Sequence, residues 1–271
     1  MTPLQFAVIG KPITHSLSPA IHQSFAAQFG INLEYHRLLG DEQHFAQQIS
    51  NFFKRNGNGM NVTLPFKEHA FQLAQVSTER CQKARSANTL WKKHNQLHAD
   101  NTDGIGLIND LKRHLVLDRL NVLILGAGGA ARGIIYPLLE QGIKQLAVYN
   151  RSPERLKALA SDFPDIDPLQ RGDLRTAFDL VINATSSSTL QEAIPLPEVL
   201  WSAKPFCYDL SYQKEADTSF VSMAKSKDCQ AIDGLGMLVE QAAEAFSIWH
   251  GVRPDTQPVL EMLRGNQVKI Q

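Results

Sequence analysis

Residues 121–152 of the chain read NVLILGAGGAARGIIYPLLEQGIKQLAVYNRS. They open with Val122–Leu125, a short apolar run typical of a strand that is buried on both faces of a parallel sheet. The spacing of the apolar residues that come next predicts a helix, which Gly142 ends. A second apolar run, Leu146–Tyr149, predicts the following strand. The stretch is therefore a strand–helix–strand unit, which indicates an α/β protein.

A glycine-rich turn, Gly126–Ala131, lies between the first strand and the helix. Its spacing, Gly-x-Gly-x-x-Ala, is the dinucleotide-binding fingerprint with alanine in the last position. Gly126 permits the tight turn, Gly128 lets the backbone approach a pyrophosphate, and Ala131 keeps the helix close to the strand. A plain glycine-rich turn is the weaker alternative, because this pattern follows a strand and opens a helix. The candidate cofactor contacts are Gly126, Ala127, Gly128, Gly129 and Ala130.

The end of the second strand, Asn150-Arg151-Ser152, indicates which dinucleotide binds. NAD-binding chains usually place Asp or Glu here to hold the ribose 2′-hydroxyl, and this chain has no acidic residue before Glu154. The Arg151 guanidinium can instead form a two-pronged, charge-assisted contact with a 2′-phosphate. A solvated surface arginine is the alternative. We therefore expect NADP as the cofactor, with Asn150, Arg151 and Ser152 beside it.

The bulk composition indicates one large or two medium-sized domains. The chain has 271 residues, of which 43% are hydrophobic, and this is enough for sizeable cores. It carries 27 basic and 27 acidic residues, so nothing suggests a nucleic-acid or membrane partner. The three scattered cysteines, Cys81, Cys207 and Cys229, argue against a disulfide framework.

Neither a leader nor a membrane anchor is expected. The apolar run Gln5–Gly10 reads as a first strand rather than as part of a basic-then-apolar signal. No apolar stretch is long enough to cross a bilayer. We therefore expect a soluble, cytoplasmic protein. No group of His, Cys, Asp and Glu residues has the spacing of a metal site, so no metal is expected.

Two serines stand before the first predicted helix. Ser18 is followed by Pro19, a combination that starts helices with serine as the cap, and capping alone would account for Ser18. Ser16 adds a second hydroxyl beside the same helix end, which is a suitable place for a small carboxylate. Both serines are therefore candidate ligand contacts.

Residues 60–67, MNVTLPFK, end a predicted strand where a helix begins. Alternate side chains share one face of a strand, so Asn61 and Thr63 point together, away from the packed side. Paired polar groups at the carboxyl end of a strand suit a hydroxylated ligand. Lys67 lies in the first helical turn, where the helix end disfavours a cation. An exposed lysine is the alternative, but we interpret this unfavourable placement as functional.

Asp103 and Gln241 are further candidates, each with a structural alternative. Asp103 begins a predicted helix and could merely cap it, although Thr102 could serve as the cap and leave the carboxylate free. Gln241 shares a helix face with apolar residues through three- and four-residue steps. It could be a satisfied interior amide, or it could project into a ligand site. Its position after a glycine turn favours the second interpretation.

Taken in order, the motifs of the chain resemble those of the shikimate dehydrogenase family over essentially the whole length. They are Ser16-Leu17-Ser18-Pro19, NVTLPFK at 61–67, ANTL at 87–90, DNTDG at 100–104, Gly126–Arg132, NRS at 150–152, NAT at 183–185 and DGLGML at 233–238. The resemblance implies NADP-dependent interconversion of shikimate and 3-dehydroshikimate, in the shikimate pathway of aromatic amino-acid and chorismate biosynthesis. Two positions depart from the usual family pattern: Ser186–Ser188 lacks a common glycine, and Leu210 stands where methionine is frequent.

The resemblance also implies a role for each site residue. Lys67 and Asp103 would form the catalytic pair, and either could carry the proton that leaves the substrate hydroxyl. The residues expected at the substrate carboxylate end are Ser16, Ser18 and Tyr212. Those expected at the ring hydroxyls are Thr63, Asn88, Asp103 and Gln241, with Asn61 nearby. Those expected near the cofactor, besides the turn and Asn150–Ser152, are Glu79, Asn183, Leu210 and Gly234.

The expected architecture is α/β with two domains. Residues 1–103 and 237–271 would form an N-terminal substrate-binding and catalytic domain, and 104–236 a Rossmann-type NADP-binding domain, with a cleft between them for the substrate. One alternative is a dehydrogenase of broader specificity that also accepts quinate. Another is a non-catalytic, NADP-responsive binding protein, which would need neither Lys67 nor Asp103. A monomer or a homodimer is expected.

Overall fold

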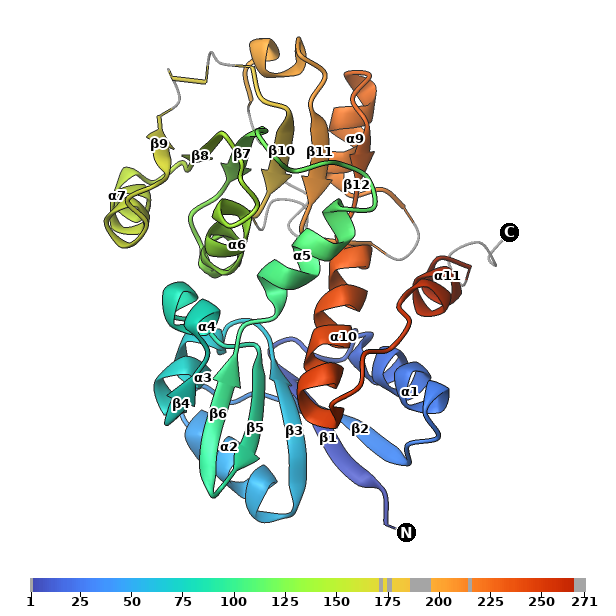
Figure 1. Ribbon diagram of the computed structural model, residues 1–271. Coiled ribbons are helices and arrows are strands. Elements are labelled where there is room, and N and C mark those ends of the chain that lie inside the picture. The colour runs from blue at the N-terminus through green and yellow to red at the C-terminus, as the bar shows by residue number, and fades with distance from the viewer. Residues whose placement is uncertain (1, 171–172, 175–176, 186–195, 214–215, 266–271) are drawn as a thin grey trace. The chain divides into compact units, whose positions relative to one another are not determined.

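The computed structural model describes residues 2–170, 173–174, 177–185, 196–213 and 216–265 (Figure 1). The chain divides into two compact units: unit 1 holds the residues up to Gly106 together with Leu238–Gly265, and unit 2 holds Leu107–Met237. These divisions lie beside the predicted domain boundaries at 103/104 and 236/237. The assignment of substrate to one domain and of cofactor to the other stays a prediction at this point.

Unit 1 contains a six-stranded mixed sheet with the strand order β2-β1-β3-β5-β6-β4. The strands are β1 (Leu4–Gly10), β2 (Leu33–Leu39), β3 (Gly57–Val62), β4 (Val76–Ser77), β5 (Thr89–Lys93) and β6 (Gln96–Asp100). Strand β5 is antiparallel to both of its neighbours, pairing Thr89 with Asn61 on one side and with Asp100 on the other. The end of β3, the start of β5 and the end of β6 therefore meet at one edge of the sheet.

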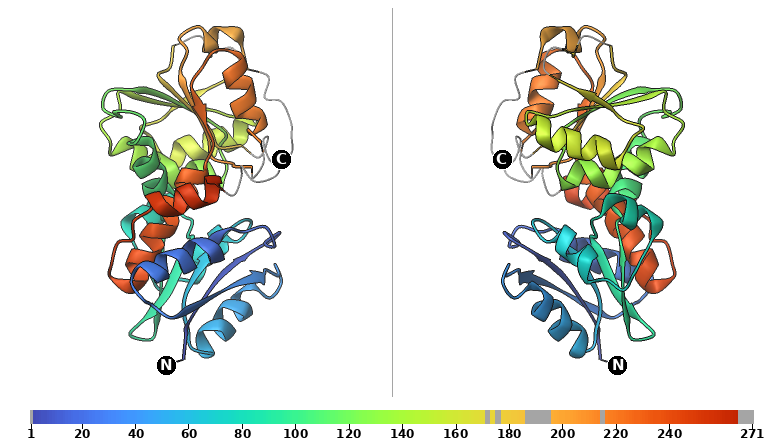
Figure 2. Two further views of the ribbon diagram at one scale, coloured as in Figure 1. Left: turned by 90° about the vertical axis from the view of Figure 1, so that its right-hand side faces the viewer. Right: turned by 90° about the vertical axis from the view of Figure 1, so that its left-hand side faces the viewer.

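Both faces of the unit 1 sheet are covered, because alternation along β1 sends its side chains to two cores. Ala7 and Ile9 pack with α2 and α3, whereas Phe6 and Val8 pack on the opposite face. Figure 2 shows α1 and α10 on the face opposite to α2, and the rings of Phe25 and Phe246 join these two helices. The helices are α1 (Ser18–Gln28), α2 (Phe45–Lys54), α3 (Lys67–Leu73), α4 (Glu79–Ala84), α10 (Leu235–His250) and α11 (Gln257–Gly265).

Unit 2 contains a six-stranded sheet whose described strands are all parallel, in the order β12-β11-β10-β7-β8-β9. The strands are β7 (Asn121–Leu125), β8 (Gln145–Tyr149), β9 (Asp167–Leu169), β10 (Leu180–Asn183), β11 (Phe206–Asp209) and β12 (Ala231–Ile232). The order along the chain reverses between β7 and β10, where Leu125 pairs with Asn183. A doubly wound sheet binds nucleotides at such a switch point.

Helices bury both faces of β7, as its apolar run predicts. Its Val122 and Ile124 pack with α6, while Leu123 and Leu125 pack with α9 on the other side. The helices that lie within unit 2 are α6 (Gly129–Leu139), α7 (Pro153–Asp162) and α9 (Ser219–Ser226), with a short 3₁₀ helix at Glu198–Trp201. Helix α5 (Asp103–Leu111) begins in unit 1 and ends in unit 2, and α10 begins in unit 2 and continues into unit 1. The strand–helix–strand unit expected from residues 121–152 is therefore β7, α6 and β8.

Some predicted ends are shifted. Ser18 is the first residue of α1 and not its cap, since Leu17 occupies the cap position without a side-chain hydrogen bond. Lys67, expected in the first turn of a helix, is the first residue of α3. The sequence did not predict β4, β9 and β12, because strands of two or three residues are too short to show an alternation pattern. Among the described residues, no helix is long and apolar enough to span a membrane.

Candidate active site

A lysine and an aspartate meet at the edge of the unit 1 sheet. Lys67 begins α3, and Asp103 begins α5. Lys67 Nζ donates to Asp103 Oδ2 at 2.5 Å, and the two side chains are only 20% and 9% exposed. Because the pair is largely shielded from water, its Coulomb attraction exceeds that of a surface ion pair. The fold thus brings together the two residues that the sequence predicted to act as a pair.

The Asp103 carboxylate is held through both of its oxygens. Oδ1 accepts a hydrogen bond from Asn88 Nδ2 at 2.8 Å, while Oδ2 faces Lys67. The backbone amide of Asp103 donates to Asn101 Oδ1 at 3.1 Å, so a neighbouring amide satisfies this helix-end N–H. The carboxylate is therefore engaged by site residues, which favours the functional alternative over simple capping.

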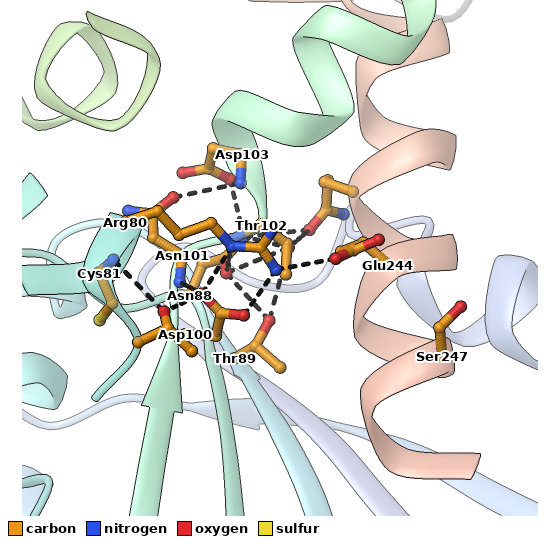
Figure 3. A network of polar contacts seen from close by, with 12 residues as sticks. Arg80, Cys81, Asn88, Thr89, Asp100, Asn101, Thr102, Asp103, Glu244 and Ser247 are labelled. Carbon is orange, nitrogen blue, oxygen red and sulfur yellow. Dashed lines mark hydrogen bonds and ion pairs between the residues drawn. The ribbon is translucent and has the colours of Figure 1, made fainter. Parts of the chain in front are cut away.

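Gln241 reaches the same polar cluster from α10. Its Oε1 lies 3.2 Å from Asn88 Nδ2 and 3.4 Å from Thr102 Oγ1, and its Nε2 donates to the Leu238 carbonyl at 2.9 Å. Figure 3 shows Asn88, Thr102 and Asp103 gathered at the sheet edge beside α10. The Gln241 side chain is hydrogen-bonded and also directed at the predicted site, so it combines the two alternatives that the sequence left open.

Asn61 and Thr63 differ in how far their polar atoms are already used. Asn61 is buried: its Oδ1 accepts from the Tyr35 hydroxyl at 2.6 Å. Its Nδ2 donates to the Asn88 carbonyl at 3.1 Å and to Thr89 Oγ1 at 3.2 Å. Thr63 is half-buried, and its hydroxyl has no hydrogen-bond partner among the described residues. Thr63 can therefore offer a donor to a ligand, whereas Asn61 has committed both of its amide hydrogens.

Ser16 and Ser18 lie together at the start of α1. Ser16 Oγ donates to Ser18 Oγ at 3.1 Å, and the Ser18 backbone amide lies 3.3 Å from Ser16 Oγ. Arg37, which the sequence reasoning missed, donates from Nε and Nη2 to the Ser16 carbonyl at 2.9 and 2.6 Å. This two-pronged contact of the Arg37 guanidinium fixes the segment that carries both hydroxyls, and it adds positive charge beside them.

The sequence reasoning also missed the buried groups that support Asn61. Tyr35 and His22 stack with their ring centroids 4.5 Å apart and an interplanar angle of 12°. Burial lowers the pKa of His22 to about 3, helped by the nearby His250 and opposed by the nearby Asn61 side chain, and neither ring nitrogen has a hydrogen-bond partner among the described residues. Burial also raises the pKa of Tyr35, so both groups are neutral near pH 7. An aromatic residue in a predicted strand was a usable signal for Tyr35, but a lone histidine in a helix was not one for His22.

In unit 2, the glycine turn has the geometry that its spacing predicts. Gly126 has a φ of +110°, and a Cβ added there would lie 3.1 Å from the Ala184 carbonyl oxygen. Gly128 occupies the cap position of α6, with Gly129 and Ala130 in the first turn. A Cβ added at position 128 or 129 would meet no described atom within 4 Å. The amino end of α6 is therefore open to an anionic group such as a pyrophosphate.

Asn150, Arg151 and Ser152 border this turn at the end of β8. Asn150 Oδ1 accepts a hydrogen bond from the Ala127 amide at 3.2 Å, and Ser152 caps α7 by accepting from the Arg155 amide. Arg151 is exposed and forms no hydrogen bond or ion pair within the described ranges. Its guanidinium is therefore available to a phosphate, as expected for an NADP-binding unit.

Three other cofactor candidates lie at or just after the ends of β10, β11 and β12. Asn183 is buried; its Nδ2 donates to Asp209 Oδ1 at 3.1 Å, and its Oδ1 accepts from the Thr185 hydroxyl at 2.7 Å. The Leu210 amide donates to the Asn183 carbonyl at 2.9 Å. A Cβ at Gly234 would lie 2.4 Å from the Leu210 carbonyl oxygen. These contacts fix the backbone at the strand ends. The Asn183 side chain is used for hydrogen bonds within the protein, to Asp209 and Thr185.

The remaining candidates lie in both units. Tyr212 follows β11 in unit 2, and burial, with the nearby Asp233 charge, raises its pKa. Glu79 is the first residue of α4 in unit 1 and is exposed. Ser186–Ser188 lies outside the described residues. Within the described part of the chain, no group of three or more His, Cys, Asp and Glu residues could hold a metal ion.

A Rossmann-type unit and a lysine–aspartate pair among amides and hydroxyls define the class of dinucleotide-dependent α/β oxidoreductases. Family models match three parts of the chain. They describe a shikimate dehydrogenase substrate binding domain at residues 8–90, a shikimate / quinate 5-dehydrogenase at 110–195 and a shikimate 5′-dehydrogenase C-terminal domain at 234–264. The chain belongs to the shikimate dehydrogenase family.

Relatives match over nearly the whole length. A shikimate dehydrogenase (NADP(+)) of Legionella pneumophila is 58% identical over 260 residues, which cover 96% of this chain and 98% of the relative. One of Acinetobacter baumannii is 44% identical over 263 residues, covering 94% and 99%. A crystal structure of shikimate 5-dehydrogenase from Thermus thermophilus, in complex with NADP(H) and shikimate, has a TM-score of 0.88 at 33% identity and covers 97% and 99%. These matches confirm the family that the motifs indicated.

Proposed function

We propose that Lys67 and Asp103 are the catalytic pair of this enzyme. The reaction is the NADP-dependent interconversion of shikimate and 3-dehydroshikimate, a step of the shikimate pathway. The observation that supports the residue assignment is the 2.5 Å contact between Lys67 Nζ and Asp103 Oδ2, surrounded by side-chain amides and hydroxyls. A polar cluster of this kind, at the edge of a sheet where strands end, suits a small polyhydroxylated ring.

The chemistry requires one proton-transfer group. Oxidation of a secondary alcohol removes a hydride from carbon, which NADP accepts when bound, and a proton from oxygen. Lys67 Nζ and Asp103 Oδ2 share a hydrogen bond, so a proton taken by either atom can be redistributed between them. In the reductive direction the same pair returns the proton to the forming hydroxyl. The pH dependence of kcat, measured in the wild type and in Lys67 and Asp103 variants, distinguishes which of the two atoms takes the proton.

Thr63, Asn88, Asp103 and Gln241 would hold the ring hydroxyls. The Thr63 hydroxyl lacks a partner among the described residues. The Gln241 Oε1 contacts, at 3.2 and 3.4 Å, are long enough to be exchanged for a ligand hydroxyl. Asn61 supports this group from below, because its amide binds the Asn88 carbonyl and Thr89. We therefore assign Asn61 to holding Asn88 rather than to direct donation to the substrate.

Ser16, Ser18 and Tyr212 would bind the substrate carboxylate. The two serine hydroxyls are adjacent, and the Arg37 fork on the Ser16 carbonyl keeps their loop in place. Hydroxyl donors together with a nearby guanidinium favour an anionic group. Tyr212 stays protonated at neutral pH, because burial raises its pKa, so it can serve as a third donor.

NADP is the cofactor, and the residues that would contact it belong mainly to unit 2. The open amino end of α6 at Gly128 and Gly129 would receive the pyrophosphate. The unpaired Arg151 would bind the 2′-phosphate, with Asn150 and Ser152 beside it, since no described residue engages its guanidinium. The remaining proposed contacts are Ala127, Ala130, Asn183, Leu210 and Gly234, and Glu79 from unit 1.

The test is a steady-state assay with purified protein, shikimate and either NADP or NAD, followed through the absorbance of the reduced nicotinamide. We expect turnover with NADP, weaker turnover with NAD, and a lower kcat/KM on quinate than on shikimate. Equal kcat/KM on the two acids would instead indicate the broader-specificity alternative. Tight NADP binding without any reduction would indicate the non-catalytic alternative. A cytoplasmic location and a monomeric or homodimeric state stay predictions from the sequence.

A further inference from the structure

Arg80 bridges two acidic side chains that come from different elements of unit 1. Its Nε and Nη2 donate to Asp100 Oδ1 and Oδ2 at 2.8 and 2.6 Å, and Nη2 also donates to Glu244 Oε1 at 2.8 Å. Arg80 lies in α4, Asp100 ends β6 and Glu244 lies in α10. Figure 3 shows the guanidinium between the sheet edge, where β6 ends, and α10.

The Asp100 side of this bridge leads to the catalytic carboxylate. Asp100 Oδ1 accepts from the Asn101 amide at 2.7 Å, and Asn101 Oδ1 accepts from the Asp103 amide at 3.1 Å. Thr78 Oγ1 donates to the same Asp100 oxygen. Asp100 is only 3% exposed, so its position is set by these donors rather than by water. The start of α5, and with it Asp103, is therefore anchored on the Arg80–Asp100 pair.

The Glu244 side of the bridge leads to Gln241. The two residues are three positions apart on α10, so their side chains lie on neighbouring parts of one helix face. Gln241 in turn faces Asn88 and Thr102 at the sheet edge. The ion pair between Arg80 and Glu244 therefore holds α10 close enough to the sheet for Gln241 to reach Asn88 and Thr102.

We propose that Arg80 is a positioning residue for the shikimate site, which sets the spacing between the Asp103 carboxylate and the Gln241 amide. The inference rests on the proposed function, in which both side chains bind substrate hydroxyls. Arg80 acts on them through Asp100 and Glu244, the two carboxylates that it binds. A guanidinium suits this role because its planar fork binds one carboxylate through two bonds and still has N–H groups for a second.

A purely structural ion pair is the alternative, and the chain contains a matched control for it. Arg253 donates to Glu244 Oε2 at 2.8 Å and to Glu240 Oε2 at 2.7 Å, on the same helix. It follows α10, and both of its ion pairs within the described residues are to that helix. Arg253 therefore stabilises α10 without joining it to the Asp103 segment. Loss of either arginine weakens the helix, but only loss of the Arg80 bridge changes the spacing of the site.

The experiment compares Arg80→Lys, Glu244→Ala and Arg253→Gln with the wild-type enzyme. Arg80→Lys keeps the charge beside the buried Asp100 but cannot reproduce the fork, and Glu244→Ala leaves the Arg80–Asp100 pair intact. For each variant, the shikimate KM, the NADP KM, kcat and the thermal midpoint are measured. We expect the shikimate KM to rise about tenfold in Arg80→Lys and Glu244→Ala, the scale of a lost charge-assisted hydrogen bond. The NADP KM should stay within about twofold.

In Arg253→Gln the shikimate KM should stay within about twofold, even if the thermal midpoint falls. A wild-type shikimate KM in both Arg80→Lys and Glu244→Ala overturns the positioning role. An equal rise in Arg253→Gln overturns it as well, because helix stability alone would then explain the effect. Because the thermal midpoint of every variant is measured alongside its kinetics, loss of folding is separated from loss of positioning.

A double-mutant cycle tests whether Glu244 acts through Gln241. Gln241→Leu alone should raise the shikimate KM, and adding Glu244→Ala should then raise it by much less than in the wild-type background. Full additivity contradicts the inference while leaving the proposed function in place. An unchanged shikimate KM in Gln241→Leu contradicts the assignment of Gln241 to the substrate, and the positioning role fails with it.

Discussion

Lys67 and Asp103 are 36 residues apart in the chain, yet each begins a helix and their side chains meet at 2.5 Å. The amino end of a helix favours an anion and disfavours a cation, so Asp103 is well placed and Lys67 is not. The carboxylate compensates the placement of the lysine. A lysine at this position weakens the helix end unless a carboxylate compensates it. The presence of the Lys67–Asp103 pair is therefore better explained by a catalytic role than by a contribution to the stability of the fold.

Lys67→Ala should lower kcat by about 10³-fold, the scale of a lost general acid–base group, with the shikimate KM changed by less than about fivefold. Steady-state kinetics at saturating NADP measure both values. Lys93→Ala, at an exposed lysine of β5, is the control and should behave as wild type. A kcat within a few-fold of wild type in Lys67→Ala would remove the lysine from the mechanism.

His22 should make the protein less stable in mild acid. Its pKa is about 3 in the folded protein because of burial, against 6.5 in the unfolded chain. Below pH 6.5, His22 binds a proton in the unfolded chain but not in the folded protein. The contribution of His22 to the free energy of unfolding is therefore fully present above pH 6.5 and falls as the pH decreases towards 3. Each pKa unit corresponds to about 1.4 kcal/mol, which gives a loss of about 2 kcal/mol between pH 7 and pH 5.

Urea unfolding at several pH values measures this loss. His22→Leu should show a smaller decrease in unfolding free energy over the same range, whatever its stability at pH 7. His36→Leu, which removes an exposed histidine of β2, should keep the wild-type dependence. Identical pH dependence in the wild type and in His22→Leu would contradict the buried neutral state of His22.

The sequence predicted those parts of the fold and site that depend on neighbours along the chain. The turn at Gly126–Gly129 and the strand–helix–strand unit around it follow from local spacing. The alternation in residues 60–64 predicts that Met60, Val62 and Leu64 pack together. Met60 and Val62 do pack in one core, but the prediction was wrong for Leu64, which is 66% exposed because the strand ends at Val62. Local rules suffice here because a backbone period fixes which side chains point together.

Contacts between distant segments could not be predicted in the same way. Tyr35 reaches Asn61 because β1 lies between β2 and β3, an order that no local pattern shows. Arg37 reaches the Ser16 carbonyl, and Arg80 reaches Glu244 across 164 positions, through the same kind of tertiary arrangement. Family motifs predicted the residues that would contact ligands, but not the residues that hold them in place.

Arg151→Ala should weaken NADP binding selectively. Loss of a guanidinium that pairs with a 2′-phosphate should raise the NADP KM about tenfold to a hundredfold, as expected for charge-assisted hydrogen bonds. The KM for NAD should change by less than about twofold, because NAD lacks that phosphate. The measurement is KM for each cofactor at saturating shikimate, with Arg155→Ala on the neighbouring α7 as the control. Equal changes for NADP and NAD would argue against the phosphate contact.

The glycine turn separates cofactor binding from folding, because its two key glycines are needed for different reasons. Gly126→Ala places a side chain at a φ of +110° and 3.1 Å from the Ala184 carbonyl, so the unfolding free energy should fall by about 1–3 kcal/mol. Gly128→Ala has no described atom within 4 Å of its new methyl group and an ordinary φ of −93°, so stability should be retained. That methyl group would occupy the space expected for the pyrophosphate, and NADP affinity should fall at least about tenfold. Urea unfolding and calorimetric titration with NADP measure the two effects, and a Gly128→Ala protein that binds NADP normally would show that the pyrophosphate lies elsewhere.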